Sequence, residues 1–262
     1  MHRRGNLFWG SILILLAILL LLKQFGMLAG DIFGYFWPLV VIAFGIWFIV
    51  GYFTRGRPGA SEQVSIPLEG ATSASIRLDH AAGRLTLRSG AGPTEIVNGM
   101  VTHGLSIKTL VEAGRMELRL RPSQQAWGWF PGETMDWDLR LNREIPLNLK
   151  IDSGASTSNL DLSDLKVTDL KIDTGASSTV LTLPANSGNT RADIDTGASS
   201  LKVSIPAGVA AKIQVKSGIA SVTVDARFPR ITSGLYQSSD YDTAANRVDM
   251  TIDAGVGSIE II

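Results

Sequence analysis

Apolar and polar residues alternate along most of the chain after residue 62, and the alternation comes in units of similar length. In the stretch 192–205, apolar residues occupy every second position before and after a central Thr-Gly-Ala-Ser, and polar residues fill the gaps. A period of two predicts strands with one buried and one solvated face. The pattern recurs around four glycines that lie 21, 22 and 21 positions apart, namely Gly154, Gly175, Gly197 and Gly218. A period near twenty residues is typical of stacked units that bury their faces against one another.

Each unit consists of a strand before the glycine and a strand after it. The four copies read LKIDSGAS (149–156), LKIDTGAS (170–177), ADIDTGAS (192–199) and IQVKSGIA (213–220), and fainter copies occupy 76–87 and 250–261. We expect the glycine to supply a backbone conformation that bulkier residues adopt only at a cost, at a tight corner. Val180 breaks the alternation and should face outward. The sequence therefore predicts an all-β, β-solenoid-like stack of GAS-turn repeats, each about 21 residues long.

The corner sequence Asp-Thr-Gly-Ala-Ser resembles the active-site motif of aspartic proteases. It occurs at 173–177 and 195–199, and at 152–156 with Ser in place of Thr. A protease needs two such carboxylates face to face, about 3 Å apart and sharing a proton. Here the motif recurs on equivalent turns, so the repeat itself explains it. We therefore interpret Asp152, Asp173 and Asp195, like the four glycines, as structural turn residues, and we predict that the protein is not an enzyme.

The same aspartates could form an acidic ladder that attracts a hard cation. The ladder offers one carboxylate per unit, however, and the dense glycine- and aspartate-rich repeats of calcium-binding solenoids are absent. We expect a solvated ladder whose charge repulsion is relieved by Lys216 and Lys171. His80 is expected to be a surface turn residue. No catalytic residue, metal site or cofactor is predicted.

Two apolar runs precede the repeats and predict an N-terminal transmembrane α-hairpin, with spans at about 7–28 and 32–53. A cleaved signal peptide is the alternative for the first run. Arginines flank the outer ends of both runs, at positions 3, 4, 55 and 57. Because basic residues favour the cytoplasmic side, we expect a multi-pass protein of the cell membrane whose β domain is cytoplasmic.

The domain organisation follows from these patterns. We predict the transmembrane hairpin at 1–54, a linker at 55–61 and the β-repeat domain at 62–262. An insert at 124–137 is rich in tryptophan, and its Trp127, Trp129 and Phe130 either cap the stack, contact a partner or bind a small ligand. The net charge of zero gives no sign of a nucleic-acid partner, and the absence of cysteine excludes disulfides.

The chain resembles a known bacterial family. Trp9-Gly10 and the Phe-Trp-Pro-Leu of 36–39 are similar to the LiaI/LiaF-type transmembrane region, and the GAS-turn repeats resemble the toast-rack and adhesin-like β-repeat domains of LiaF-like cell-wall-active antibiotic response proteins. The resemblance implies a membrane regulator that restrains an envelope-stress histidine kinase, and it carries over no catalytic residue.

The leading hypothesis is therefore a membrane-anchored, non-enzymatic regulator or sensor of envelope stress that binds a sensor histidine kinase or another membrane protein. Two alternatives stay open. One is a structural, self-assembling scaffold that forms homo-oligomers, because solenoids have open ends. The other is a surface- or glycan-binding adhesin-like module, if the domain is extracellular.

Overall fold

A computed structural model of the protein describes residues 39–42, 45, 61–123 and 135–262. Residues 39–42 and 45 are helical. In this described part, no helix reaches the length and apolar character that a membrane crossing requires. The first predicted span, most of the second, and the aromatic residues Trp127, Trp129 and Phe130 lie outside the described residues.

Residues 61–123 and 135–262 belong to one compact unit, which is almost entirely β-structure. Its strands, in chain order, are β1 (Ser61–Pro67), β2 (Ser73–Ser89), β3 (Glu95–Thr102), β4 (Leu105–Glu112), β5 (Arg115–Pro122), β6 (Trp137–Leu141), β7 (Pro146–Asp161), β8 (Lys166–Thr182), β9 (Asn189–Ser204), β10 (Ala210–Val224), β11 (Arg230–Thr232), β12 (Leu235–Gln237) and β13 (Arg247–Ile261). The predicted all-β class is confirmed, and the long stacked sheet agrees with a solenoid-like fold.

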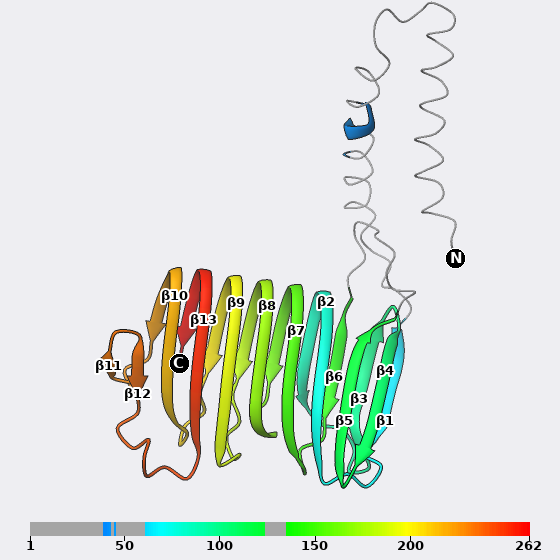
Figure 1. The fold of residues 1–262 in the computed structure, drawn as a ribbon, viewed down its shortest axis with the longest axis horizontal. Coiled ribbons are helices and arrows are strands. Elements are labelled where there is room, and N and C mark those ends of the chain that lie inside the picture. Colours follow the sequence, from blue (N-terminus) through cyan, green and yellow to red (C-terminus); the bar gives the residue numbers. More distant parts are fainter. Residues whose placement is uncertain (1–38, 43–44, 46–60, 124–134) are drawn as a thin grey trace, which may run out of the picture. The chain divides into compact units, whose positions relative to one another are not determined.

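Six long strands of 15 to 17 residues lie parallel and side by side in the order β2-β7-β8-β9-β13-β10 (Figure 1). Each strand has a corner at equivalent positions, which read Gly-Ala in β7, β8 and β9, Ala-Ala in β2, Gly-Val in β13 and Gly-Ile in β10. In β7, alternate residues from Leu147 to Ser153 are buried before the corner, and alternate residues from Ser156 to Leu160 are buried after it. Gly154 and Ala155 both face solvent, and this pair shifts the alternation by one residue. The two halves of β2, β7, β8, β9 and β13 therefore turn their apolar faces towards one shared core, whereas the second half of β10 has no buried residue.

The order of the coils departs from the chain order that the repeats suggest. The C-terminal strand β13 lies between β9 and β10, and it pairs in parallel with both. The fourth repeat is thus not adjacent to the third. The connection from Asp225 to Asn246 carries the hairpin β11–β12, whose β12 pairs with the first half of β10 at Lys212–Gln214. This long return lets the last strand fill the gap that β10 leaves beside β9.

The other end of the stack divides into two branches. The first half of β2 pairs with β5, which forms a hairpin with β4. The second half of β2 pairs with β6, and β3 and β1 follow beyond it. Trp137, which the sequence places in the tryptophan-rich insert, is the first residue of β6 and is buried in the core at 1% exposure.

The corner glycines do not have the special backbone conformation that we expected. None of Gly154, Gly175, Gly197 and Gly218 has a φ in the left-handed region. Close packing between coils explains them instead. A Cβ atom on Gly175 would lie 3.1 Å from the carbonyl oxygen of Gly154, and one on Gly197 would lie 2.7 Å from that of Gly175. Glycine is required because the backbone of the next coil occupies the space of a side chain.

His80 is buried at 1% exposure, so its prediction as a surface turn residue was wrong. It occupies the inward position of the β2 corner, as the Cα partner of Ser153. Its Nε2–H donates to the Met135 carbonyl at 2.8 Å, its Nδ1 lies 3.4 Å from the Ser153 hydroxyl, and its ring packs edge-on against Trp137. Burial lowers the pKa of His80. The side chain therefore serves the core in its neutral form.

We predict that Gly197→Ala lowers the free energy of unfolding by about 1–3 kcal/mol, because the added methyl group meets a backbone carbonyl that cannot move without disturbing the neighbouring coil. Urea unfolding of the detergent-purified chain, followed by circular dichroism, measures it. Val180→Thr is the control, since Val180 faces outward as expected, at 43% exposure, and should change stability by less than about 0.5 kcal/mol. Equal losses in the two variants would contradict the close-approach account.

We also predict a pH-dependent contribution from His80. Because its folded pKa lies below the unfolded value of about 6.5, the unfolded chain binds the proton more readily, and stability falls as pH decreases through 6.5. Between pH 7.5 and 5.5, the wild type should lose up to about 1.4 kcal/mol more stability than His80→Gln. Urea titrations at both pH values measure this difference. The same pH-dependent loss in both proteins would mean that His80 takes up a proton in the folded state.

Candidate functional site

The hydroxyl residues of the protease-like motif point into the corner. Thr174 and Thr196 are buried, at 4% and 3% exposure. The Thr174 hydroxyl lies 3.0 Å from the Ser177 hydroxyl, and Ser199 Oγ donates to Thr196 Oγ1 at 2.8 Å. These pairs join the two halves of the strand inside the bend. The threonine and the serine of the motif thus have a structural role at the corner.

The aspartates of the motif lie on the opposite, outer side of the strand. Asp173 and Asp195 are exposed and are Cα partners on neighbouring strands. The structure brings Asp152, Asp173 and Asp195 into one row and adds residues that the site prediction did not include. The complete row runs Asp79, Asp152, Asp173, Asp195, Asp253 and Lys216. Lys216 ends the row on β10.

A row of cations lies beside this row, two residues earlier on the strands. It comprises Lys108, Arg119, Arg77, Lys150 and Lys171, on β4, β5, β2, β7 and β8. Of this row, only Lys171 was expected beside the aspartates. A sequence pattern could have revealed the members of the row that lie in the repeats. A cation stands two residues before the aspartate in Arg77-Leu78-Asp79 and again in Lys150-Ile151-Asp152. Lys108 and Arg119 come from strands outside the repeat, so only the sheet topology reveals them.

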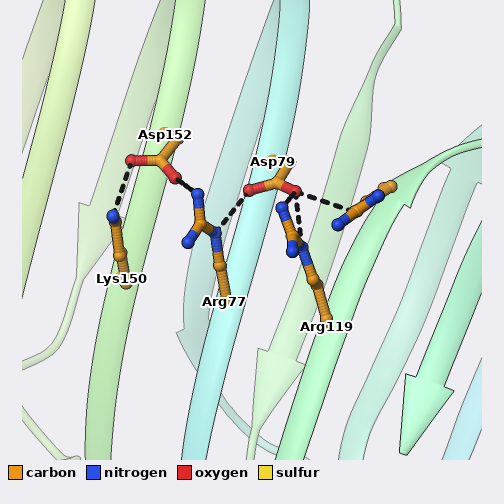
Figure 2. Close-up of polar contacts among 6 residues, drawn as sticks. Arg77, Asp79, Arg119, Lys150 and Asp152 are labelled. Carbon is orange, nitrogen blue, oxygen red and sulfur yellow. Dashed lines mark hydrogen bonds and ion pairs between the residues drawn. The ribbon is translucent and has the colours of Figure 1, made fainter.

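Ion pairs connect the two rows at the β2 end (Figure 2). Asp79 is bound by Nε of Arg77 and of Arg119, each at 2.8 Å, and by Nε of Arg121 at 3.0 Å. Arg77 also reaches Asp152 at 2.6 Å, and Lys150 lies 3.6 Å from Asp152. Burial alone raises the pKa of Asp79, but the hydrogen bonds from Arg77 and Arg119 outweigh it and hold the pKa below its ordinary value. Asp79 therefore stays ionised at the centre of the network.

These side chains line an open groove of about 1100 Å³ on the outer face. Its walls come from β4, β5, β2, β7 and β8, and its lining consists of Arg77, Asp79, His80, Ala81, Ser106, Lys108, Arg119, Arg121, Pro122, Lys150, Asp152, Ser153, Gly154 and Asp173. We take this groove as the candidate functional site, because it is where the charged rows meet a concave surface.

A second, smaller hollow of about 520 Å³ lies over β8, β9 and β13. Tyr241 lines it together with Asp169, Arg191 and Asp249. Burial, followed by the charge of Asp249, raises the pKa of Tyr241. Within the described ranges, no group of three or more histidine or acidic side chains is arranged to hold a metal ion. The chemistry that this surface offers is thus charge recognition.

Comparisons with known proteins agree with the fold. The sequence profile of the N-terminal domain of toast_rack, DUF2154, matches residues 55–204, and the LiaI-LiaF-like transmembrane region matches residues 7–49. No curated protein matches the chain.

Two solved structures are similar. A candidate cell adhesion protein from Clostridium sporogenes ATCC 15579 is 23% identical with a TM-score of 0.71, over 77% of this chain and 98% of its own. A candidate adhesin from Bacteroides fragilis NCTC 9343 is 10% identical with a TM-score of 0.25, over 79% and 100% of the two chains, and supports no argument. The first similarity establishes the fold alone. The family match covers more than half of the chain, and the protein therefore belongs to the toast-rack family, as a LiaF-like member with a LiaI/LiaF-type transmembrane region.

Proposed function

We propose that the protein is a membrane-anchored, non-enzymatic regulator of the response to cell-envelope stress, which acts by binding another membrane protein such as a sensor histidine kinase. The LiaI-LiaF-like transmembrane region supports attachment to the membrane. In this proposal the β unit faces the cytoplasm, on the ground of the arginines that flank the two apolar runs.

The paired rows of charge are the observation that carries the proposal. Neighbouring strands fix the charges about 4.8 Å apart within a row, and two residues along a strand separate the rows by about 6.6 Å. Lys171, Asp173 and Asp195 are exposed on this face. A rigid pattern of opposite charges can select a partner of complementary pattern and reject others by like-charge repulsion. Such a surface suits recognition of a protein.

A self-assembling scaffold is the second candidate, and the β10 end of the stack favours it. The hairpin β11–β12 covers only the first half of β10. In the second half, Ile219 is 79% exposed, and Val222 and Val224 are only half-buried. Among the described strands, none pairs with the outer edge of this uncharged second half, and such an edge is a template for pairing with another chain. Assembly of purified protein that rises with concentration would favour this candidate.

The charged face can be tested by reversing two cations of its row. We expect Lys150→Glu/Lys171→Glu to weaken partner binding by several kcal/mol, because like charges would then meet across the interface. In the host bacterium, transcription of envelope-stress genes under a cell-wall-active antibiotic should then resemble that of a deletion strain and differ severalfold from wild type.

Arg143→Glu/Lys202→Glu is the matched control, because both residues are exposed or half-exposed and neither belongs to the cation row. It should respond like the wild type. If the deletion strain itself responds normally, the regulator proposal fails. If the deletion changes the response but both double variants behave alike, the charged face is not the contact surface.

A further inference from the structure

The groove carries more positive than negative charge. Five of its lining residues are cationic, namely Arg77, Lys108, Arg119, Arg121 and Lys150, and three are anionic, namely Asp79, Asp152 and Asp173, so its net charge is +2. The excess is not spread evenly. Arg77 and Lys150 contact Asp152, which balances part of their charge on the β7 side. The uncompensated charge therefore lies over β4, β5 and β2.

At this end, several cations share a single carboxylate. Arg77, Arg119 and Arg121 all bind Asp79, and both contacts of Arg119 and the contact of Arg121 use the same oxygen, Oδ2. Lys108, the Cα partner of Arg119, has no ion-pair partner among the residues that the structure describes. This end of the groove thus holds three cations (Arg119, Arg121 and Lys108) and one anion (Asp79), and its net charge is +2.

The donor groups at this end of the groove are of the kind that bind an oxyanion. Each guanidinium offers five N–H groups in a planar fork, and Asp79 occupies only part of this set. The side chains of Arg119 and Arg121 are 37% and 41% exposed, so they remain accessible from the groove. Ser106, the Cα partner of Arg121, places a hydroxyl donor on the same wall, which β4 forms.

We propose that the end of the groove over β4, β5 and β2 binds a doubly charged oxyanion, a phosphate group, through Lys108, Arg119 and Arg121. A phosphate group of charge −2 neutralises the local excess, whereas a single carboxylate neutralises only half of it. Asp152 and Asp173 border the site on the other side and repel a longer polyanion that would extend along the groove. The site takes one phosphate group, from inorganic phosphate or from a lipid headgroup that ends in a phosphate monoester. It does not depend on a protein partner.

The test is calorimetric titration of the full chain in dodecyl maltoside with inorganic phosphate, at low ionic strength and pH 7.5. We expect saturable binding that Lys108→Gln/Arg121→Gln weakens by at least about tenfold, because two charge-assisted contacts are lost. Ser106→Asp should weaken it similarly by placing a negative charge on the wall, without removing a cation from the network. Arg143→Gln/Lys202→Gln should bind like the wild type. Affinity should also fall from pH 7.5 to 5.5, because inorganic phosphate takes up a proton over this range and loses its second negative charge.

A second titration with dihexanoyl phosphatidic acid, a lipid whose headgroup is a phosphate monoester and can carry two negative charges, identifies the source. If this lipid competes with phosphate, the site accepts a headgroup, and if only inorganic phosphate binds, the site takes the free ion; either result supports the proposal. No phosphate binding by the wild type, or equal binding by wild type and the Lys108→Gln/Arg121→Gln variant, would overturn it. Tighter binding of a hexaglutamate peptide than of phosphate would also overturn it, in favour of an acidic protein segment.

Discussion

The backbones of neighbouring coils approach so closely at their corners that a side chain has no room there. Each corner glycine faces the carbonyl oxygen of the coil beside it, which lies 2.5–3.1 Å from the position that a Cβ would occupy. This contact runs through Gly154, Gly175, Gly197, Gly255 and Gly218. It fixes the register of the long strands, because a shift by one residue would place a Cβ against that carbonyl and would turn the apolar face outward. This register also determines where the inner hydroxyls, the core leucines and the outer charges lie.

In-register stacking has an electrostatic consequence. Equivalent aspartates from five coils must lie side by side, and like charges at this spacing repel. At the β2 end, ion pairs from Arg77, Arg119 and Arg121 to Asp79 relieve the repulsion. At the β10 end, Lys216 is the Cα partner of Asp253. The branch strands β4 and β5 bring additional cations to the β2 end. Positive charge there therefore exceeds the negative charge of the aspartates. The candidate site is thus a result of how the repeat array ends.

The sequence predicted the period, the alternation, the outward Val180 and the stacking of the aspartates, because these depend on local patterns. Other features depend on contacts between distant segments. The insertion of β13 follows from a long return connection that leaves no mark on the repeat. His80 became a core residue because Met135 and Trp137 cover it from another branch. The corner glycines were predicted, but for a conformational reason, whereas the physical reason is the space between coils.

The placement of the last strand tests this account most directly, and cysteine pairs can measure it because the chain has no cysteine of its own. Asp195 and Asp253 are Cα partners, about 4.8 Å apart, whereas Lys216 lies one strand further, at roughly 9.6 Å from Asp195. A disulfide needs Cα atoms about 4.4–6.8 Å apart. Under mild oxidation, Asp195→Cys/Asp253→Cys should form an intrachain disulfide, and Asp195→Cys/Lys216→Cys should not. Efficient bonding of the second pair and none of the first would contradict the inserted strand and the glycine contact that runs through it.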